Sequence, residues 1–444
     1  MGQNLGRLII SAADRLWGGP NVILLFSLGV YLTLRYRFIQ IRWFLACWNS
    51  LSAGREHRAR GVLTQFQAFA TAVGATVGIG NIAGIATALV SGGPGSVFWM
   101  WFYGFFATVI KFTEASLGLR FRILENETDR VRSGPMYYLR DGLNSPFLAA
   151  AFALAAGIGE LFTTPFTQPN SMAVVLQSQF RVAPMVSGVL IALLTGIVIM
   201  GGIGVIGRVA ERFTPLKIGI YLIGGILVIG RHYDQVLGAF ASIFRDAFSL
   251  HSIGGGSLGI GMIRAMRYGV SRGVNANEAG IGTAAVAYGT ARSKEPSSQG
   301  LAAMLEVIIV TFVISSVTAL VILTSGVLGS GATSTALVAQ AFDTALPKGG
   351  WLLALCTCLI GYSTLLSCAF YGEQFFEYLL GFSVAIPYRC MFCVLIFFGA
   401  IIRVETLWAW GDILIGVQLL PNIVGIVALS GLVARDVRHS KAPV

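Results

Sequence analysis

The sequence predicts an all-α membrane protein that crosses the bilayer about eleven times. Of the 444 residues 55% are hydrophobic and only 11% are charged, against roughly 25% charged in a typical soluble domain. Apolar runs recur along the whole chain, and about 20 such residues suffice to span a bilayer. One of these runs contains a glycine-rich interruption, and such breaks are found in membranes only where they are buried in protein or line a cavity.

The first apolar run stands apart, because the ten that follow divide into two sets of five. It lacks a small-residue cleavage site, so residues 1–64 are expected to form an extra N-terminal helix and a basic cytoplasmic loop. Five is odd, so the second set enters from the opposite side, which predicts a 5+5 inverted repeat with discontinuous helices. The first run is 20–36, the repeat at 65–231 contains 65–90, 93–119, 147–180, 183–206 and 214–231, and the repeat at 232–437 contains 235–268, 300–328, 350–380, 384–401 and 405–434.

The basic residues predict the orientation of the chain. When the loops are assigned alternately to the two sides, 23 of the 31 lysines and arginines fall on one side. The positive-inside rule then places the N-terminus outside and the C-terminus in the cytoplasm. This assignment puts Lys217 in a cytoplasmic loop and leaves only Lys111 and Arg245 within spans. The net charge of +11 is therefore a topology signal, and no nucleic-acid partner is predicted.

No pattern in the chain predicts an enzyme or an organic cofactor. The four histidines form no H-E-x-x-H motif, and no convincing nucleophile triad is present. The segment from Gly78 to Gly84 matches G-x-G-x-x-G, but it lacks the preceding strand and the following acid of a dinucleotide site. The six cysteines lie in or beside apolar runs and are expected to be small buried hydrophobes.

The interruption of the second apolar run is the strongest candidate for a binding site. Gly74, Gly78, Gly80 and Gly84 each cost about 1 kcal/mol relative to alanine in a helix. A second interruption is expected at 254–261, in the corresponding span of the second repeat. Paired interruptions at corresponding positions favour a transporter site over simple helix packing through small residues.

A broken helix offers two kinds of binding group. The free N–H groups of its second half suit a carboxylate, which Gly78 and Gly80 would let approach closely. The carbonyls freed at the break suit a hard cation such as Na⁺. Carbonyls between Phe248 and Ser252 could then accept hydrogen bonds from the ammonium of an amino acid.

Polar residues within other spans could complete the site. Gln168 and Asn170 are candidates for substrate binding. Alternatively, part of this polarity could serve only to satisfy the backbone groups whose helical hydrogen bonds are broken by nearby Pro165 and Pro169. Hydroxyls of Ser363, Thr364 and Ser367 could bind a cation or bridge helices. Lys111 and Glu114, spaced i,i+3, are expected to pair with each other or to reach the interface. The acids of the spans are functional candidates by default, since charge in a membrane is costly: Glu160, Asp246, Glu306 and Glu373.

Several motifs in order resemble the alanine/glycine:cation symporter family of bacteria and archaea. The resemblance covers nearly the whole chain. It implies the inverted-repeat fold of the leucine transporter plus one extra N-terminal helix. It also implies a plasma-membrane carrier, functional as a monomer, that imports small neutral amino acids with Na⁺ by alternating access. The motifs are Gly78–Gly84, Gly92–Trp101, Lys111–Glu114, Gln168–Ser171, Gly207–Arg212, Arg272–Gly280 and Tyr371–Glu373.

The resemblance also implies roles for individual residues. The carbonyls of Gly74 and Val77 would hold one Na⁺ together with the hydroxyls of Ser363 and Thr364. A second sodium site of some relatives falls at Thr76 and Asn81. The substrate carboxylate would be held by the Gln168 amide and by the backbone of Gly78, Ile79 and Gly80.

The chain departs from the family pattern at two places. Relatives typically show Gly-Trp where this chain has Ser367-Cys368, and a small residue other than proline at Pro169. Loss of an indole could enlarge the pocket beside Cys368, so a larger neutral amino acid such as glutamine stays open as the substrate. A proton-coupled or exchange-type carrier is the alternative mechanism.

Overall fold

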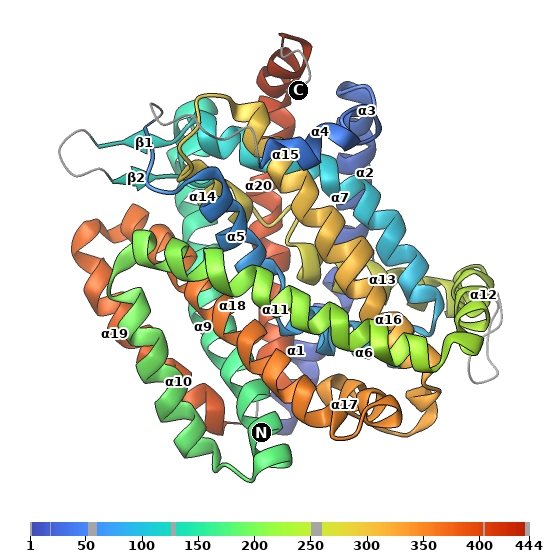
Figure 1. The fold of residues 1–444 in the computed structure, drawn as a ribbon. Coiled ribbons are helices and arrows are strands. Elements are labelled where there is room, and N and C mark those ends of the chain that lie inside the picture. Colours follow the sequence, from blue (N-terminus) through green and yellow to red (C-terminus); the bar gives the residue numbers. More distant parts are fainter. Residues whose placement is uncertain are drawn as a thin grey trace.

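The computed structural model describes residues 2–17, 19–51, 60–125, 130–249, 260–402 and 405–439 (Figure 1). Within these residues seven helices are long and apolar enough to cross a membrane, and the bent pair of α5 and α6 adds an eighth span. The only sheet in this part of the chain is the hairpin of β1 (Ile123–Leu124) and β2 (Val131–Arg132). The predicted all-α membrane fold is confirmed, while the count of eleven crossings stays a prediction.

The helices follow the apolar runs in most places. In the first half they are α1 (Gly2–Trp17), α2 (Pro20–Arg35), α3 (Ile39–Arg42), α4 (Phe44–Ser50), α5 (Gln65–Thr76), η1 (Ile79–Asn81), α6 (Ala83–Gly92), α7 (Gly95–Arg120), α8 (Pro135–Tyr137), η2 (Tyr138–Gly142), α9 (Pro146–Phe180), α10 (Pro184–Ile199) and α11 (Gly202–Arg231). In the second half they are η3 (Tyr233–Gln235), α12 (Val236–Ala247), α13 (Ile260–Asn277), α14 (Thr283–Gly289), α15 (Pro296–Val307), η4 (Ile308–Ile314), α16 (Ser315–Thr324), η5 (Val327–Gly329), α17 (Ser334–Ala345), α18 (Gly349–Leu380), η6 (Phe382–Val384), α19 (Ala385–Ile401) and α20 (Glu405–His439).

The first predicted break lies between α5 and α6. A capping box starts α5, since the Thr64 hydroxyl accepts a hydrogen bond from the Gln67 amide and the Gln67 side chain accepts one from the Thr64 amide, both at 3.1 Å. The helix ends at Thr76, and Gly78 takes an extended conformation with φ −105° and ψ −175°. The two halves of this span are inclined by 59°. Backbone groups of Gly74 to Gly80 are thereby released from a continuous helix.

The break that the structure describes in the second half lies beyond the interruption predicted at 254–261. Residues 254–259 of that predicted interruption lie outside the described residues, so it stays a prediction. The described break separates α13 from α14, where Glu278, Gly280 and Gly282 have φ values of 56°, 93° and 93°. The apolar run at 235–268 is described as two helices: α12 ends at Ala247, and α13 is described from Ile260. Left-handed backbone at Glu278, the residue directly after α13, ends this helix, and Gly280 and Gly282 continue the break.

The two breaks meet in the middle of the helical bundle. In the interior, α9 packs along α18 and α20, and α11 packs on α5 and α18. At one edge of the molecule α10 and α19 lie side by side (Figure 1). The free end of α1 and the C-terminal end of α20 lie at opposite ends of the molecule (Figure 1). Chain ends on opposite sides are expected when a chain crosses the membrane an odd number of times.

Candidate substrate and ion site

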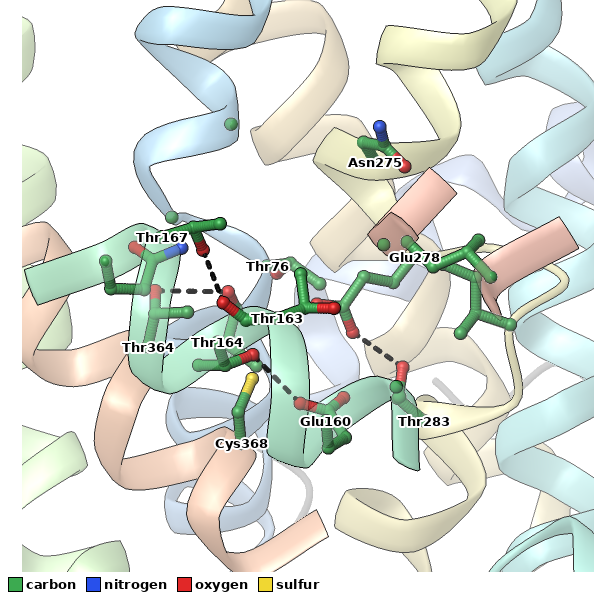
Figure 2. A pocket seen from close by; sticks show the side chains of 18 of the residues that line it. Thr76, Glu160, Thr163, Thr164, Thr167, Asn275, Glu278, Thr283, Thr364 and Cys368 are labelled. Carbon is green, nitrogen blue, oxygen red and sulfur yellow. Dashed lines mark hydrogen bonds between the residues drawn. The ribbon is translucent and has the colours of Figure 1, made fainter. Parts of the chain in front are cut away.

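A cavity of about 110 Å³ lies between the two broken helices (Figure 2). Its walls come from the α5–α6 break, α9, the α13–α14 break, α18 and α20. A single water needs roughly 10–15 Å³ by the same measure. The cavity therefore has room for several waters or for one small amino acid.

One wall of the cavity carries the groups predicted to hold a carboxylate. Gly78, Gly80 and Gln168 all line it. The side chain of Ile79 is fully buried, and its amide donates a hydrogen bond to Gln168 Oε1 at 3.3 Å. The structure thus brings the predicted backbone and amide groups together in the lining of the cavity.

Three carboxylates line the same cavity, and one of them, Asp412 of α20, is paired with Arg272 at 2.9 Å. Glu160 of α9 accepts a hydrogen bond from the Thr164 hydroxyl at 3.0 Å, and Glu278 accepts one from the Thr283 hydroxyl at 2.6 Å (Figure 2). Carboxylates in a largely enclosed cavity attract an ammonium group. The sequence does not single out Glu278, because the residue follows the apolar run at 235–268 and so falls in an expected loop.

Cys368 also lines the cavity, next to Glu160 and Thr164 (Figure 2). Its side chain is 3% exposed. The position at which relatives typically carry an indole thus faces the candidate substrate.

Two predicted substrate residues are not brought to the cavity. The Asn170 side-chain amide donates to the carbonyls of Gly399 and Ile402 at 3.3 and 2.8 Å, so it satisfies the C-terminal end of α19. Phe248 is 55% exposed, and its ring lies 4.9 Å from the ring of Phe98. The carbonyls that would follow Phe248 up to Ser252 lie largely outside the described residues.

The four predicted sodium ligands do converge, beside the cavity. The Thr364 hydroxyl donates to the carbonyl of Gly74 at 3.2 Å, and the Ser363 hydroxyl lies 3.3 Å from the same oxygen. Thr364 and Gly78 line the cavity as well, so the oxygen cluster and the cavity share a wall.

The side-chain amine of Lys217 lies at the centre of this oxygen cluster. Its Nζ lies 3.1 Å from the Gly74 carbonyl, 2.8 Å from the Val77 carbonyl and 2.5 Å from the Ser363 hydroxyl. Lys217 is 0% exposed and belongs to α11, so its assignment to a cytoplasmic loop is wrong. An ammonium has three N–H donors, and three oxygens accept from this one.

The second predicted sodium group is occupied by internal hydrogen bonds. The Thr76 hydroxyl donates to Glu306 Oε1 at 2.8 Å. The Asn81 amide donates to the Thr76 carbonyl at 2.6 Å and accepts from the Ser315 hydroxyl at 3.0 Å. This group is therefore completed by a carboxylate, Glu306, that the resemblance did not include.

Lys111 pairs with Glu306 and not with Glu114. Its Nζ lies 2.7 Å from Glu306 Oε1, and Glu114 accepts instead from the Asn422 amide at 2.7 Å. The i,i+3 spacing of Lys111 and Glu114 allowed a pair within α7, but α15 presents a carboxylate that also accepts from Thr76.

Comparisons with known proteins agree with this architecture. The family model described as the sodium:alanine symporter family matches residues 3–442. The sodium/alanine symporter AgcS of Methanococcus maripaludis is 35% identical over 97% of this chain and 96% of its own length. The probable sodium/glutamine symporter GlnT of Bacillus subtilis is 31% identical over 98% of this chain and 90% of its own. Among solved structures, MhsT in complex with L-phenylalanine aligns with a TM-score of 0.63 at 13% identity, covering 86% of this chain and 94% of that one.

Proposed function

Because this chain belongs to the sodium:alanine symporter family, we propose that it carries a small neutral amino acid across the membrane by alternating access, driven by a cation. The observation that carries the proposal is the cavity between the two helix breaks. Amide groups of the first break lie on one wall of the cavity, and the carboxylates of Glu160, Glu278 and Asp412 also line it. A zwitterionic amino acid has a carboxylate, which can accept from the amide groups, and an ammonium group, which can pair with the carboxylates.

The substrate would lie with its carboxylate toward the first break. Gly78 and Gly80 offer backbone there, and Gln168 adds an amide. The ammonium would face Glu160 and Glu278, which replaces the expected role of carbonyls near Phe248. The N-terminus of a helix has free N–H groups and a partial positive charge. Both favour binding of the carboxylate end of the substrate at the first break.

The cavity lining favours a small or polar side chain. Thr163, Thr164 and Thr167 present hydroxyls and methyl groups from one face of α9 (Figure 2). Cys368 leaves the space that an indole would fill, so a neutral amino acid larger than alanine, such as glutamine, is a second candidate. The printed name of GlnT, a probable sodium/glutamine symporter, is consistent with that second substrate within the family.

The coupling ion that the family suggests is Na⁺. The oxygens of Gly74, Val77, Ser363 and Thr364 form a cluster of the hard ligands that suit Na⁺. In the described conformation, however, this cluster surrounds the Lys217 ammonium. Sodium coupling at this cluster would require Lys217 to withdraw.

The remaining proposals concern the setting of the carrier. It would be a monomer in the plasma membrane of a bacterium or archaeon, with its N-terminus outside and its C-terminus in the cytoplasm. The repeats at 65–231 and 232–437 would move relative to each other around the cavity. No enzymatic activity and no organic cofactor are proposed.

Counterflow in proteoliposomes tests the proposed function. Vesicles loaded with one unlabelled neutral amino acid should take up labelled alanine without any ion gradient. Serine, threonine, valine and glutamine as the loaded amino acid would define the substrate range. A protein that exchanges none of these amino acids would contradict the proposal.

A further inference from the structure

We propose that a second cavity of this carrier binds one zwitterionic amino acid, on the side of the membrane that the basic residues predict to be cytoplasmic. The inference deepens the proposed function and rests on it. The second cavity measures about 360 Å³ and lies among β2, the N-terminal end of α11, the C-terminal part of α18 and the start of α19. It is more than three times as large as the cavity between the helix breaks.

The N-terminal end of α11 supplies groups for a carboxylate. Gly202, Ile203 and Gly204, the first three residues of this helix, line the second cavity. The first N–H groups of a helix have no acceptor within the helix, and no side chain caps those of α11. A helix of 30 residues also has a partial positive charge at this end. Both properties suit a carboxylate.

A guanidinium strengthens the positive character of this cavity. Arg130 lines it and lies over the ring of Phe382, 3.4 Å from the ring centroid. In the part of the chain that the structure describes, Arg130 forms no ion pair, whereas Arg132 of β2 is paired with Glu125. Arg130 is therefore the guanidinium of the cavity that is available to an anionic group.

The C-terminal part of α18 supplies acceptors for an ammonium group. Gln374 and Glu377 line the cavity and are only 5% and 8% exposed. The Gln374 amide donates to Glu377 Oε2 at 2.8 Å, but Gln374 Oε1 is buried and has no hydrogen-bond partner among the described residues. Buried acceptors are almost always paired, so an acceptor without a donor on the wall of a cavity points to a ligand that supplies one.

The remaining charges of the cavity neutralise each other. Arg389 of α19 donates to both oxygens of Glu373 at 2.6 Å, and it also donates to the Met200 carbonyl at 3.2 Å. This pair joins α18, α19 and the end of α10 and leaves no net charge for a ligand.

The groups that stay available require a ligand with two opposite charges. An anion alone would bind α11 and Arg130 but would leave Gln374 and Glu377 without a donor. A cation alone would leave the α11 amides without an acceptor. A zwitterionic amino acid satisfies both sets of groups, and it is the chemical class that the proposed function supplies.

The second cavity lies next to the first one along α18. Cys368 lines the first cavity and Glu373 lines the second, so little more than one helical turn separates them. Between them, a Cβ on Gly372 would overlap the Tyr388 hydroxyl of α19 and would lie 3.2 Å from Cβ of Glu160, which lines the first cavity. An amino acid that leaves the first cavity past this contact would enter the second one, which is therefore a release site.

The number of bound amino acids gives the first test. Equilibrium dialysis of the purified protein with saturating labelled alanine should give two alanine molecules per chain. Glu377→Gln keeps the shape of the side chain but removes its charge, so this variant should bind only one. A wild-type value of one, or a value of two in this variant, would overturn the inference.

Asp234→Asn is the matched control for the loss of a carboxylate. Asp234 accepts from the adjacent Gln235 amide at 2.8 Å, as Glu377 accepts from Gln374, but it is exposed on η3 and lines neither cavity. This variant should still bind two alanine molecules. A value of one in the control would show that the loss in Glu377→Gln is not specific, and it would overturn the inference.

A second variant fills the cavity without changing any charge. A Cβ at Gly204 meets no atom within 4 Å, so a large side chain can enter the cavity from this position. Gly204→Trp should bind one alanine molecule per chain. Gly219→Trp is its control on the same helix, because a Cβ at Gly219 also meets no atom within 4 Å and Gly219 does not line the cavity. Two alanine molecules in Gly204→Trp would overturn the inference.

The outcomes distinguish this inference from the proposed function. Alanine counterflow by a wild-type protein that binds one alanine per chain would leave the proposed carrier intact and would overturn the second site alone. Absence of both counterflow and binding with every amino acid would overturn the proposed function and the inference with it. If Glu377→Gln does not fold, the wild-type value and Gly204→Trp still decide.

Discussion

The Nζ atom of Lys111 lies 2.7 Å from Oε1 of Glu306, and the two side chains are 1% and 0% exposed. The same carboxylate accepts hydrogen bonds from the Thr76 hydroxyl, at the end of α5, and from the Tyr288 hydroxyl on α14. Lys111 in turn donates to the Asn277 carbonyl at the end of α13. This one ion pair therefore ties both helix breaks to α7 and α15.

Glu306→Gln should destabilise the protein strongly. Removing one partner of a buried pair leaves the other charge uncompensated, at a typical cost of about 3–5 kcal/mol. Thermal unfolding in detergent should show a large drop in the midpoint. The double variant Lys111→Met/Glu306→Gln should recover much of the loss, because no isolated charge remains. A single variant as stable as the wild type would show that the pair does not hold the breaks.

The first break and its oxygen cluster could be predicted from the sequence because the signal is local. Four glycines within one uncharged run disfavour a continuous helix, and Ser363 and Thr364 are adjacent hydroxyls within an apolar run. Their actual convergence depends on how α18 packs against α5, and the family resemblance supplied that pairing. In the structure these groups lie together, and their role in ion binding stays a prediction.

The second break and Lys217 were missed because their signals were read as loops. Arg272 and Glu278 lower the hydropathy of the span that contains the break, although Gly280-Ile281-Gly282 repeats the pattern Gly78-Ile79-Gly80. Lys217 follows Arg208 and Arg212 and was counted with them as a topology signal. Only tertiary packing shows that it points inward, since hydropathy does not record which face of a helix is buried.

Gly118→Ala should destabilise the protein even though alanine is the better helix former. A Cβ at this position would lie 2.4 Å from the carbonyl oxygen of Ala285, so α7 and α14 would have to separate. Overpacking of this kind typically costs about 1–3 kcal/mol. The unfolding midpoint should therefore fall, whereas the matched change Gly219→Ala meets no atom within 4 Å and should leave it unchanged or raise it. Equal midpoints for the two variants would argue against this helix contact.

Gln168→Ala should weaken amino-acid binding by about tenfold. The loss of one hydrogen bond to a charged group is worth about 1.5 kcal/mol, which corresponds to this factor. Isothermal titration or scintillation proximity binding with labelled alanine would measure the change. Asn170→Ala is the matched control: this amide binds the end of α19 outside the cavity, so its loss should affect stability and leave affinity unchanged. A weaker affinity in the control alone would place the substrate near Asn170 instead.

Cys368→Trp should narrow the substrate range toward alanine and glycine. Cys368 lines the cavity beside Glu160 and Thr164, and an indole fills far more space than a thiol. The variant should reject larger ligands by overlap, at a cost of about 1–3 kcal/mol for each misfit. Competition against labelled alanine by serine, threonine, valine and glutamine should therefore be stronger in the wild type than in the variant.

The same substitution at an exposed cysteine separates selectivity from a general effect of an added indole. Cys390 on α19 is exposed, so Cys390→Trp should leave the competition profile unchanged. If the wild type already excluded everything beyond alanine and glycine, another side chain would have to fill the volume beside Cys368. The cavity measures only about 110 Å³. That result would therefore mean that this volume already excludes side chains larger than that of alanine.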